Sequence, residues 1–312
     1  MLSRIANRVY WLSRYMERTG NTAKTVYAYA SLFLDLPAGT GTGWHTLIEI
    51  NDAEELFAEL YDKKTEDNIM NFLIFDERNP ASMYSSICFA RENARTSRDI
   101  LPSEVWEIIN GLYLTAKAEK SEKISRSRRY SYLNSVTNNV MRLEGMFNSG
   151  LSRNNTYSFI ELGRNIERAD TTTRILDVGS TLLVEGKTEF MIGHQGVIWM
   201  NLLRSMNAYQ MYRQEVKRKV VGEDVVKFLL FNDEFPRSVA FCIDQIMKFS
   251  AKLPNSDKII EMSNRIKFGL ESFSTENVTA ERIIKHMDEI QKLLAELHNG
   301  IDESWFNTSI DI

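Results

Sequence analysis

Apolar residues recur every three or four positions along most of the chain, the spacing that places them on one face of an α-helix. No segment keeps the strict alternation of a half-buried strand, and only 5 prolines and 15 glycines interrupt the pattern. The sequence therefore predicts an all-α fold, a multi-helix bundle. The predicted helices cover residues 2–34, 44–61, 65–75, 80–98, 102–120, 125–149, 156–184, 193–219, 222–231, 236–251, 256–271 and 276–299.

Three sequence blocks occur twice, in the same order and at a nearly constant offset. Residues 13–24 (SRYMERTGNTAK) match 163–174 (GRNIERADTTTR), and residues 72–82 (FLIFDERNPAS) match 228–238 (FLLFNDEFPRS). Between them, the block that begins at Trp44 matches the one that begins at Trp199. We interpret this as a tandem duplication, with a first helical repeat at 1–150 and a second at 151–312. We expect the two repeats to pack as one globular unit about a pseudo-two-fold axis.

The repeated Arg-x-x-Glu-Arg motif is the strongest candidate for a functional site. At helical spacing, each copy forms a polar stripe that continues past the motif. The candidate site residues are Arg14, Glu17, Arg18 and Asn21 in the first copy, Arg164, Glu167 and Arg168 in the second, and Arg91 and Arg95 of a separate charge cluster. Lys24 and Arg174 end the two stripes. Three interpretations stay open: a buried Arg–Glu network, a site for an anionic or carboxylate-bearing ligand, and a solvent-exposed face.

The other patterns point to few specific chemistries. The segments Asp76-x-x-x-Pro80-x-Ser82 and Asn232-x-x-x-Pro236-x-Ser238 are typical of helix starts, and the alternative is an anion site assisted by Arg237. The net charge of −4 favours no chain-wide nucleic-acid surface, and no apolar run approaches the ~18 residues of a membrane span. No metal-ligand spacing occurs. We therefore expect a cytoplasmic protein with no metal, no cofactor, and neither nucleic acid nor membrane as a partner.

The chain resembles the alpha-E family of bacterial proteins. The resemblance rests on the opening MLSRIANRVYWLSRYMERTGNTAK and on FARENAR, LGRNIERADTTTRILDV and FLLFNDEFPRS. Two departures are Tyr157, where a tryptophan is expected, and Gly20, where relatives often carry glutamate. The resemblance implies an α-helical fold without an established activity. It also implies an ATP-grasp-type ligase and a transglutaminase-like protein as partners, in making or trimming a peptide or amide-linked product.

These observations lead to one leading hypothesis and two alternatives. The leading one is an accessory or binding protein that holds a carboxylate-bearing ligand or partner in a charged groove between the repeats, with the motif arginines pairing the anion. An enzyme of amide-bond chemistry with Glu17 or Glu167 as general base is the second. The third is a structural protein in which the motifs form only an ion-pair network.

Overall fold

The computed structural model describes residues 3–35, 43–121, 124–185, 189–275 and 279–307. Every regular element within these residues is a helix, which confirms the predicted all-α fold. The helices are α1 (Ser3–Asp35), α2 (Thr46–Ile50), α3 (Glu54–Leu60), α4 (Glu66–Ile74), α5 (Met83–Arg95), α6 (Ser103–Ser121), α7 (Arg126–Gly150), α8 (Asn155–Glu185), α9 (Glu189–Ser205), α10 (Tyr209–Val216), α11 (Gly222–Phe231), α12 (Val239–Ser250), α13 (Asp257–Glu271) and α14 (Ala280–Trp305).

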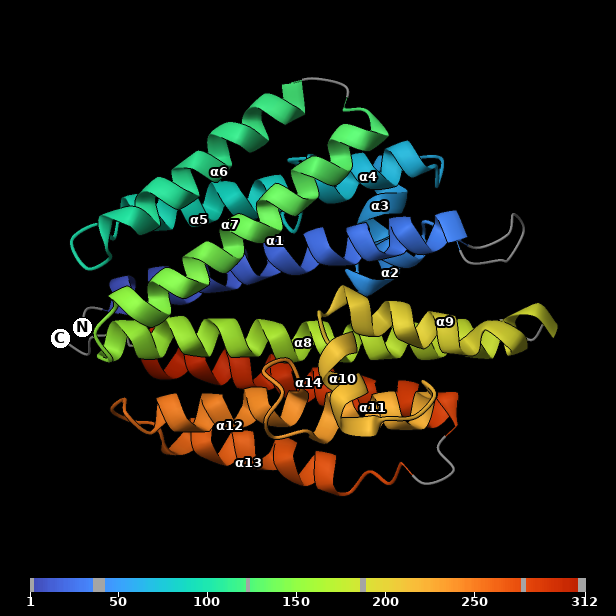
Figure 1. Cartoon of the computed structure of the whole chain (residues 1–312). Coiled ribbons are helices and arrows are strands. Elements are labelled where there is room, and N and C mark those ends of the chain that lie inside the picture. The colour runs from blue at the N-terminus through green and yellow to red at the C-terminus, as the bar shows by residue number, and fades with distance from the viewer. Residues whose placement is uncertain (1–2, 36–42, 122–123, 186–188, 276–278, 308–312) are drawn as a thin grey trace.

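Two long helices, α1 and α8, lie side by side at the centre and run in the same direction (Figure 1). Helices α5 and α7 pack against α1, while α12 and α14 pack against α8. Helix α9 contacts both central helices. The predicted boundary between residues 150 and 151 falls at the end of α7, so α1 and α8 open the two predicted repeats.

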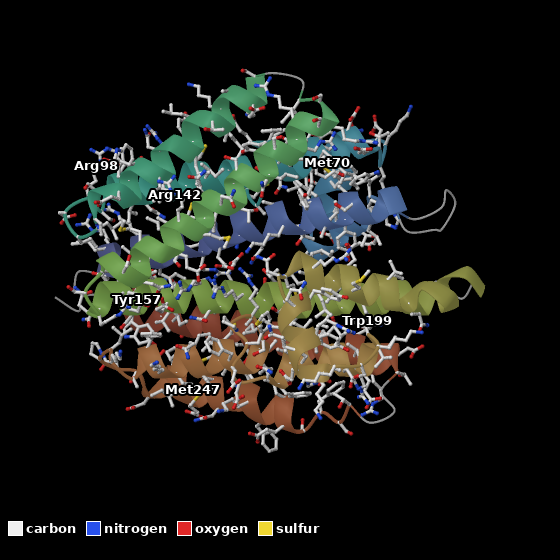
Figure 2. The ribbon with its side chains drawn as sticks, in the orientation of Figure 1. Met70, Arg98, Arg142, Tyr157, Trp199 and Met247 are labelled. Atoms are coloured by element: carbon white, nitrogen blue, oxygen red, sulfur yellow. The ribbon has the colours of Figure 1, made fainter. Side chains whose placement is uncertain are left out.

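The central helices approach each other closely at Gly163. A Cβ atom at this position would lie only 2.3 Å from the backbone oxygen of Tyr10, a distance that no larger residue tolerates without a shift of the backbone. Side chains fill the space between the neighbouring ribbons (Figure 2). The close approach brings the polar stripes of α1 and α8 into direct contact.

Two predicted helices are interrupted. The segment 44–61 divides into α2 and α3, and 193–219 divides into α9 and α10. Asp52 and Asn207 lie at these breaks with positive φ angles of 52° and 55°, a conformation that ends a right-handed helix and that Asn and Asp adopt more readily than most residues. The two positions match in the sequence when the Trp44 and Trp199 blocks are aligned. No helix in the described part of the chain is long and apolar enough to cross a membrane.

Candidate functional site

Glu167 on α8 is held by two arginines of α1. Its carboxylate accepts hydrogen bonds from Arg14 Nε at 2.8 Å and from Arg18 Nε at 2.6 Å, and Arg18 Nη2 adds a third at 3.1 Å. Glu167 is 3% exposed. Burial by itself raises the pKa of this carboxyl group, but the two guanidinium groups outweigh it and lower the pKa to about 2. Glu167 is therefore an ionised, fully paired carboxylate.

Glu17 on α1 is held in the reverse sense, by arginines of the second half of the chain. Its Oε1 lies 3.1 Å from Arg168 Nε and 2.7 Å from Arg237 Nη2. Arg237 also donates through Nη1 to Asn21 Oδ1 at 2.8 Å, and Asn21 Nδ2 donates to Thr171 Oγ1 at 3.0 Å. Glu17 is buried, which raises its pKa, but Arg168 and Arg237 reverse the effect and hold the pKa well below its ordinary value.

The arginine that matches Arg14 behaves differently. Arg164 contacts Glu161 at 2.5 Å and Glu144 at 3.2 Å, and Arg168 Nη2 reaches Glu144 at 2.7 Å. Glu144 belongs to α7 and lies outside every repeated block, so no sequence signal identified it. Arg237 was identifiable, because its block is repeated, although the sequence named it only as the helper of an alternative anion site. Buried arginines and glutamates of both halves thus form one network, which we call the ER network.

Arg91 and Arg95 lie on α5, apart from the ER network. Arg91 donates to Asn110 Oδ1 at 2.8 Å and stacks over the ring of Tyr113. Arg95 forms an exposed pair with Glu92 at 2.6 Å. The structure therefore does not bring these two residues together with the other candidate site residues.

The two proline segments serve as helix starts. Ser82 Oγ accepts a hydrogen bond from Ser85 N, and Ser238 Oγ accepts one from Phe241 N, so each serine caps the helix that follows. The helices begin at Met83 and Val239, a few residues after the prolines. Arg237 points to Glu17 rather than to these amides, and the alternative anion site at the helix start is not formed.

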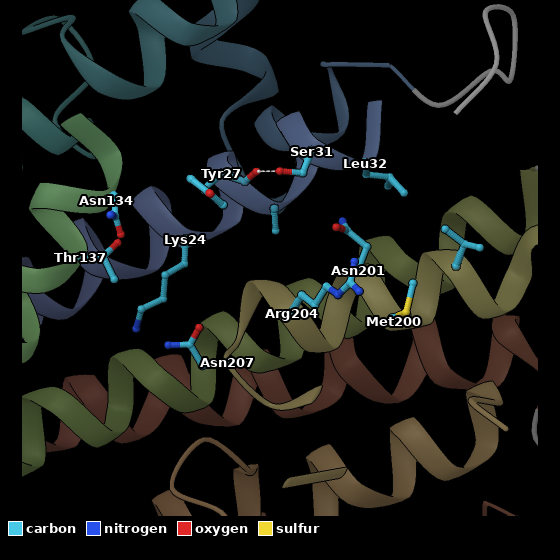
Figure 3. A pocket seen from close by; sticks show the side chains of 12 residues that line it. Lys24, Tyr27, Ser31, Leu32, Asn134, Thr137, Met200, Asn201, Arg204 and Asn207 are labelled. Carbon is cyan, nitrogen blue, oxygen red and sulfur yellow. Dashed lines mark hydrogen bonds between the residues drawn. The ribbon is translucent and has the colours of Figure 1, made fainter. Parts of the chain in front are cut away.

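Lys24, one turn beyond Asn21 on α1, faces a cavity of about 390 Å³. We call it the Lys24 cavity. It lies between α1, α7 and α9, and both polar and apolar side chains line it (Figure 3). Its polar residues include Lys24, Ser31, Asn134, Thr137, Asn201, Arg204 and Asn207, and its apolar residues include Leu32, Val197 and Met200. The cavity therefore has walls from both predicted repeats.

Lys24 is a largely buried cation without a direct hydrogen-bond or ion-pair partner in the described chain, although Glu17 and Glu144 lie close enough to act on it electrostatically. It is 9% exposed, and its amine has no hydrogen-bond or ion-pair partner among the described residues. Burial lowers its pKa, Arg237 and Arg168 lower it further, and the result is about 7 despite the opposing effect of Glu17. Asn201 is 5% exposed, and its Nδ2 also lacks a partner within the described chain. Unpaired buried donors are rare, so the Nδ2 of Asn201, together with the unpaired amine of Lys24 in the same cavity, points to an occupant that accepts hydrogen bonds.

The described residues contain no group of three His, Cys, Asp or Glu side chains placed to hold a metal ion. The site thus consists of arginines, glutamates, one lysine and amide side chains. Its chemistry is recognition of charge by buried donors and acceptors.

The fold and the site define an all-α protein whose two halves are joined by buried Glu–Arg pairs. The model of the Alpha-E family, a predicted alpha-helical domain with a conserved ER motif, matches residues 1–306. The chain therefore belongs to the Alpha-E family. In this chain the repeated blocks carry Glu-Arg at 17–18 and 167–168. Comparisons with the curated proteins and with the solved structures find no match.

Proposed function

We propose that the chain is a binding protein that holds the carboxylate group of a small ligand or of a partner's peptide in the Lys24 cavity. The observation that carries this proposal is the amine of the largely buried Lys24, which faces the cavity and has no direct partner among the described residues. An anion in the cavity would supply the missing counterion and keep Lys24 charged.

The charges around the matching residue support an anionic ligand. Arg174 matches Lys24 and has two carboxylate partners, Asp170 at 3.0 Å and Asp52 at 3.0 Å. The positions that match these acids hold Gly20 and Asn207, which carry no charge. Lys24 therefore occupies the position that matches Arg174, but the acids that match Asp170 and Asp52 are missing. A ligand carboxylate would take the place of those acids.

The cavity wall offers further donors for such a group. Arg204 lines the cavity and forms no ion pair with any described residue, and the free Nδ2 of Asn201 lies on the same helix. Lysine, arginine and amide donors together suit a carboxylate, which accepts several hydrogen bonds at once. The apolar wall formed by Leu32, Val197 and Met200 suits a ligand with an apolar part.

The ER network supports a structural role beside the binding role. Its pairs are closed between the two halves, and Glu17 and Arg168 contribute to the electrostatic field at Lys24. A general base works best with a pKa near the working pH, and the pKa values of Glu17 and Glu167 are far lower. The network therefore favours a clamp that positions Lys24 over an enzyme with a glutamate base.

The wider setting of this proposal comes from the family resemblance. In it, the chain acts in the cytoplasm as an accessory to an ATP-grasp-type ligase and a transglutaminase-like protein. It would hold a carboxylate that is to be joined in, or released from, an amide bond. Pull-down of the ligase with wild type and with Lys24→Gln tests whether the cavity takes part in that contact.

Calorimetric titration tests the binding site itself. N-acetylalanine should bind, and its carboxamide should bind at least tenfold more weakly, because only the acid balances the charge of Lys24. Lys24→Gln should weaken binding of the acid at least tenfold, whereas Lys117→Gln, an exposed lysine on α6, should leave it unchanged. Equal affinity of acid and amide, or equal effects of the two substitutions, would contradict the proposal.

Asn207→Asp tests the missing counterion directly. Aspartate at 207 restores the acid that Asp52 provides on the other side, and Asp52 shows that aspartate adopts the required positive φ. We expect N-acetylalanine to bind about tenfold more weakly to this variant, because the new aspartate competes with the ligand carboxylate for Lys24. A tenfold loss of affinity corresponds to about 1.4 kcal/mol of binding free energy. Unchanged affinity would place the ligand away from Lys24.

A further inference from the structure

A second cavity, of about 210 Å³, lies on the other side of the ER network. We call it the Ala81 cavity. Its walls come from α1, α8 and the segment after α2, and Ala81, which lies just before α5, also lines it. Arg18 and Glu167 of the ER network line it, together with Asp170 and Arg174.

The position that matches Ala81 holds an arginine. The aligned blocks at 72–82 and 228–238 place Ala81 opposite Arg237. Arg237 donates to Glu17 and to Asn21, and these two residues match Glu167 and Thr171. Glu167 and Thr171 both line the Ala81 cavity. The cavity therefore occupies the place that a guanidinium group fills on the other side of the network.

Two threonines of the cavity lining have hydroxyl groups without a partner. The residues Thr22 and Thr25 are 4% and 2% exposed, and neither side chain has a hydrogen bond to any described residue. The residue that matches Thr22 is Thr172, whose one hydroxyl proton lies between the backbone oxygens of Arg168 and Arg237, at 2.9 and 2.8 Å. Polar groups of such largely buried residues are usually paired, so these two hydroxyl groups indicate an occupant that forms hydrogen bonds.

The acceptors that remain free around the cavity indicate the chemistry of that occupant. Three carboxylates line it, those of Asp52, Glu167 and Asp170, and the guanidinium groups of Arg14, Arg18 and Arg174 contact them. Arg14 and Arg18 already hold Glu167, so the acceptors left for an occupant are on Asp170, Asp52 and the two threonines. Asp170 contacts Arg174 through only one of its oxygens, Oδ2. These acceptors suit a group rich in N–H donors.

We propose that the Ala81 cavity binds the guanidinium or primary ammonium group of a small cationic ligand. The cation takes the place that Arg237 fills on the other side, with Asp170 as its main counterion. Thr22 and Thr25 accept its remaining hydrogen bonds. This site is separate from the Lys24 cavity and takes a ligand group of the opposite charge, so either site can exist without the other.

Agmatine, which carries a guanidinium and an ammonium group on a short chain, is the probe for this site. Calorimetric titration should show binding to wild type and at least tenfold weaker binding to Ala81→Arg, because the new side chain fills the cavity as Arg237 does. Ala118→Arg adds the same charge at an exposed position of α6 and should bind agmatine like wild type. Absence of binding to wild type, or full binding to Ala81→Arg, would overturn the proposal.

Two further variants keep the test decisive if Ala81→Arg does not fold. Asp170→Asn removes the main counterion and should weaken agmatine binding at least tenfold without filling the cavity. Lys24→Gln alters only the other cavity and should leave agmatine binding unchanged. If Asp170→Asn binds agmatine as wild type does, or if Lys24→Gln abolishes binding, the cation binds elsewhere and the inference is wrong.

Discussion

Arg174 and Lys24 occupy matching positions on α8 and α1, but their surroundings differ in charge. Arg174 lies between Asp170 and Asp52, whereas Lys24 faces a cavity and forms no direct ion pair in the described chain, although Glu17 and Glu144 act on it electrostatically. Burying a cation without a partner costs free energy, and the cost appears as the lowered pKa of Lys24. The same position thus holds a closed ion pair on one side and, on the other, an unpaired amine that faces a cavity, which is the basis of the binding proposal.

The two proline segments differ in the opposite sense. Arg237 supplies a cation to Glu17, and Ala81 at the matching position supplies none. The Lys24 side of the network therefore lacks the acids found beside Arg174, and the Ala81 side lacks the cation that Arg237 provides. Each difference leaves a cavity lined by largely buried residues whose polar groups have no partner, which is why we propose ligands of opposite charge for the two cavities.

The largest loss of stability is expected from breaking an Arg–Glu pair of the ER network, because both sides of the network contain such closed pairs. Glu167→Gln leaves the buried Arg14 and the partly buried Arg18 without their shared counterion, and loss of one partner of a buried pair costs about 3–5 kcal/mol. The free energy of unfolding, measured with urea, should fall by that amount. Glu92→Gln breaks the exposed pair with Arg95 and should cost less than about 1 kcal/mol.

The difference in unfolding free energy between wild type and Glu167→Gln should depend on pH, which gives a further check. The pKa of Glu167 falls from 4.5 to about 2 on folding, so its pairs stabilise the folded state fully above pH 4.5. As the pH falls from 4.5 toward 2, the carboxylate takes up a proton and the stabilisation is lost. The gap between wild type and Glu167→Gln should narrow across this window. A gap that stays constant would mean that charge does not cause the effect.

Much of the fold followed from the sequence, because periodic apolar positions specify helices directly. The breaks at Asp52 and Asn207 did not, since each depends on a single residue with positive φ inside an otherwise helical pattern. The repeated blocks identified Arg14, Glu17, Arg18 and their counterparts, and the structure brings those residues together. The duplication and its pseudo-two-fold axis stay predictions.

The parts of the site that sequence analysis missed depend on packing between distant helices. Glu144 on α7 contacts Arg164 and Arg168, and no residue spacing along the chain predicts these contacts. Arg91 and Arg95 were included because arginines cluster there, but α5 directs them to α6 and to solvent. Lys24 was identified as the end of a stripe, and only the cavity around it shows that it lacks a counterion.

An intermediate effect is expected from removing the buried cation. Lys24→Met replaces the amine with an apolar side chain of similar length and should raise the free energy of unfolding below pH 7 by about 1–3 kcal/mol. Lysine has a pKa of 10.5 when unfolded and about 7 here, so between these values only the unfolded chain binds the proton. Wild-type stability therefore rises with pH across this window.

The advantage of Lys24→Met should accordingly be full below pH 7, shrink as the pH rises, and vanish near pH 10.5. Urea unfolding at a series of pH values measures it, with Lys117→Met as the exposed control, for which we expect no trend. A destabilised Lys24→Met at neutral pH would show that the amine has a partner within the protein, and it would remove the basis for the binding site.

The smallest effect is expected from Asp52→Asn, which makes the Arg174 side resemble the Lys24 side. The Asp52 side chain is 72% exposed, so water screens its pair with Arg174 and the loss should be below about 1 kcal/mol. Arg174 keeps Asp170, and asparagine adopts the same positive φ at position 207, so the backbone has no reason to change. Urea unfolding measures the loss. A cost as large as that of Glu167→Gln would show that Asp52 belongs to the structural clamp, and the comparison between the two sides would then reflect stability rather than binding.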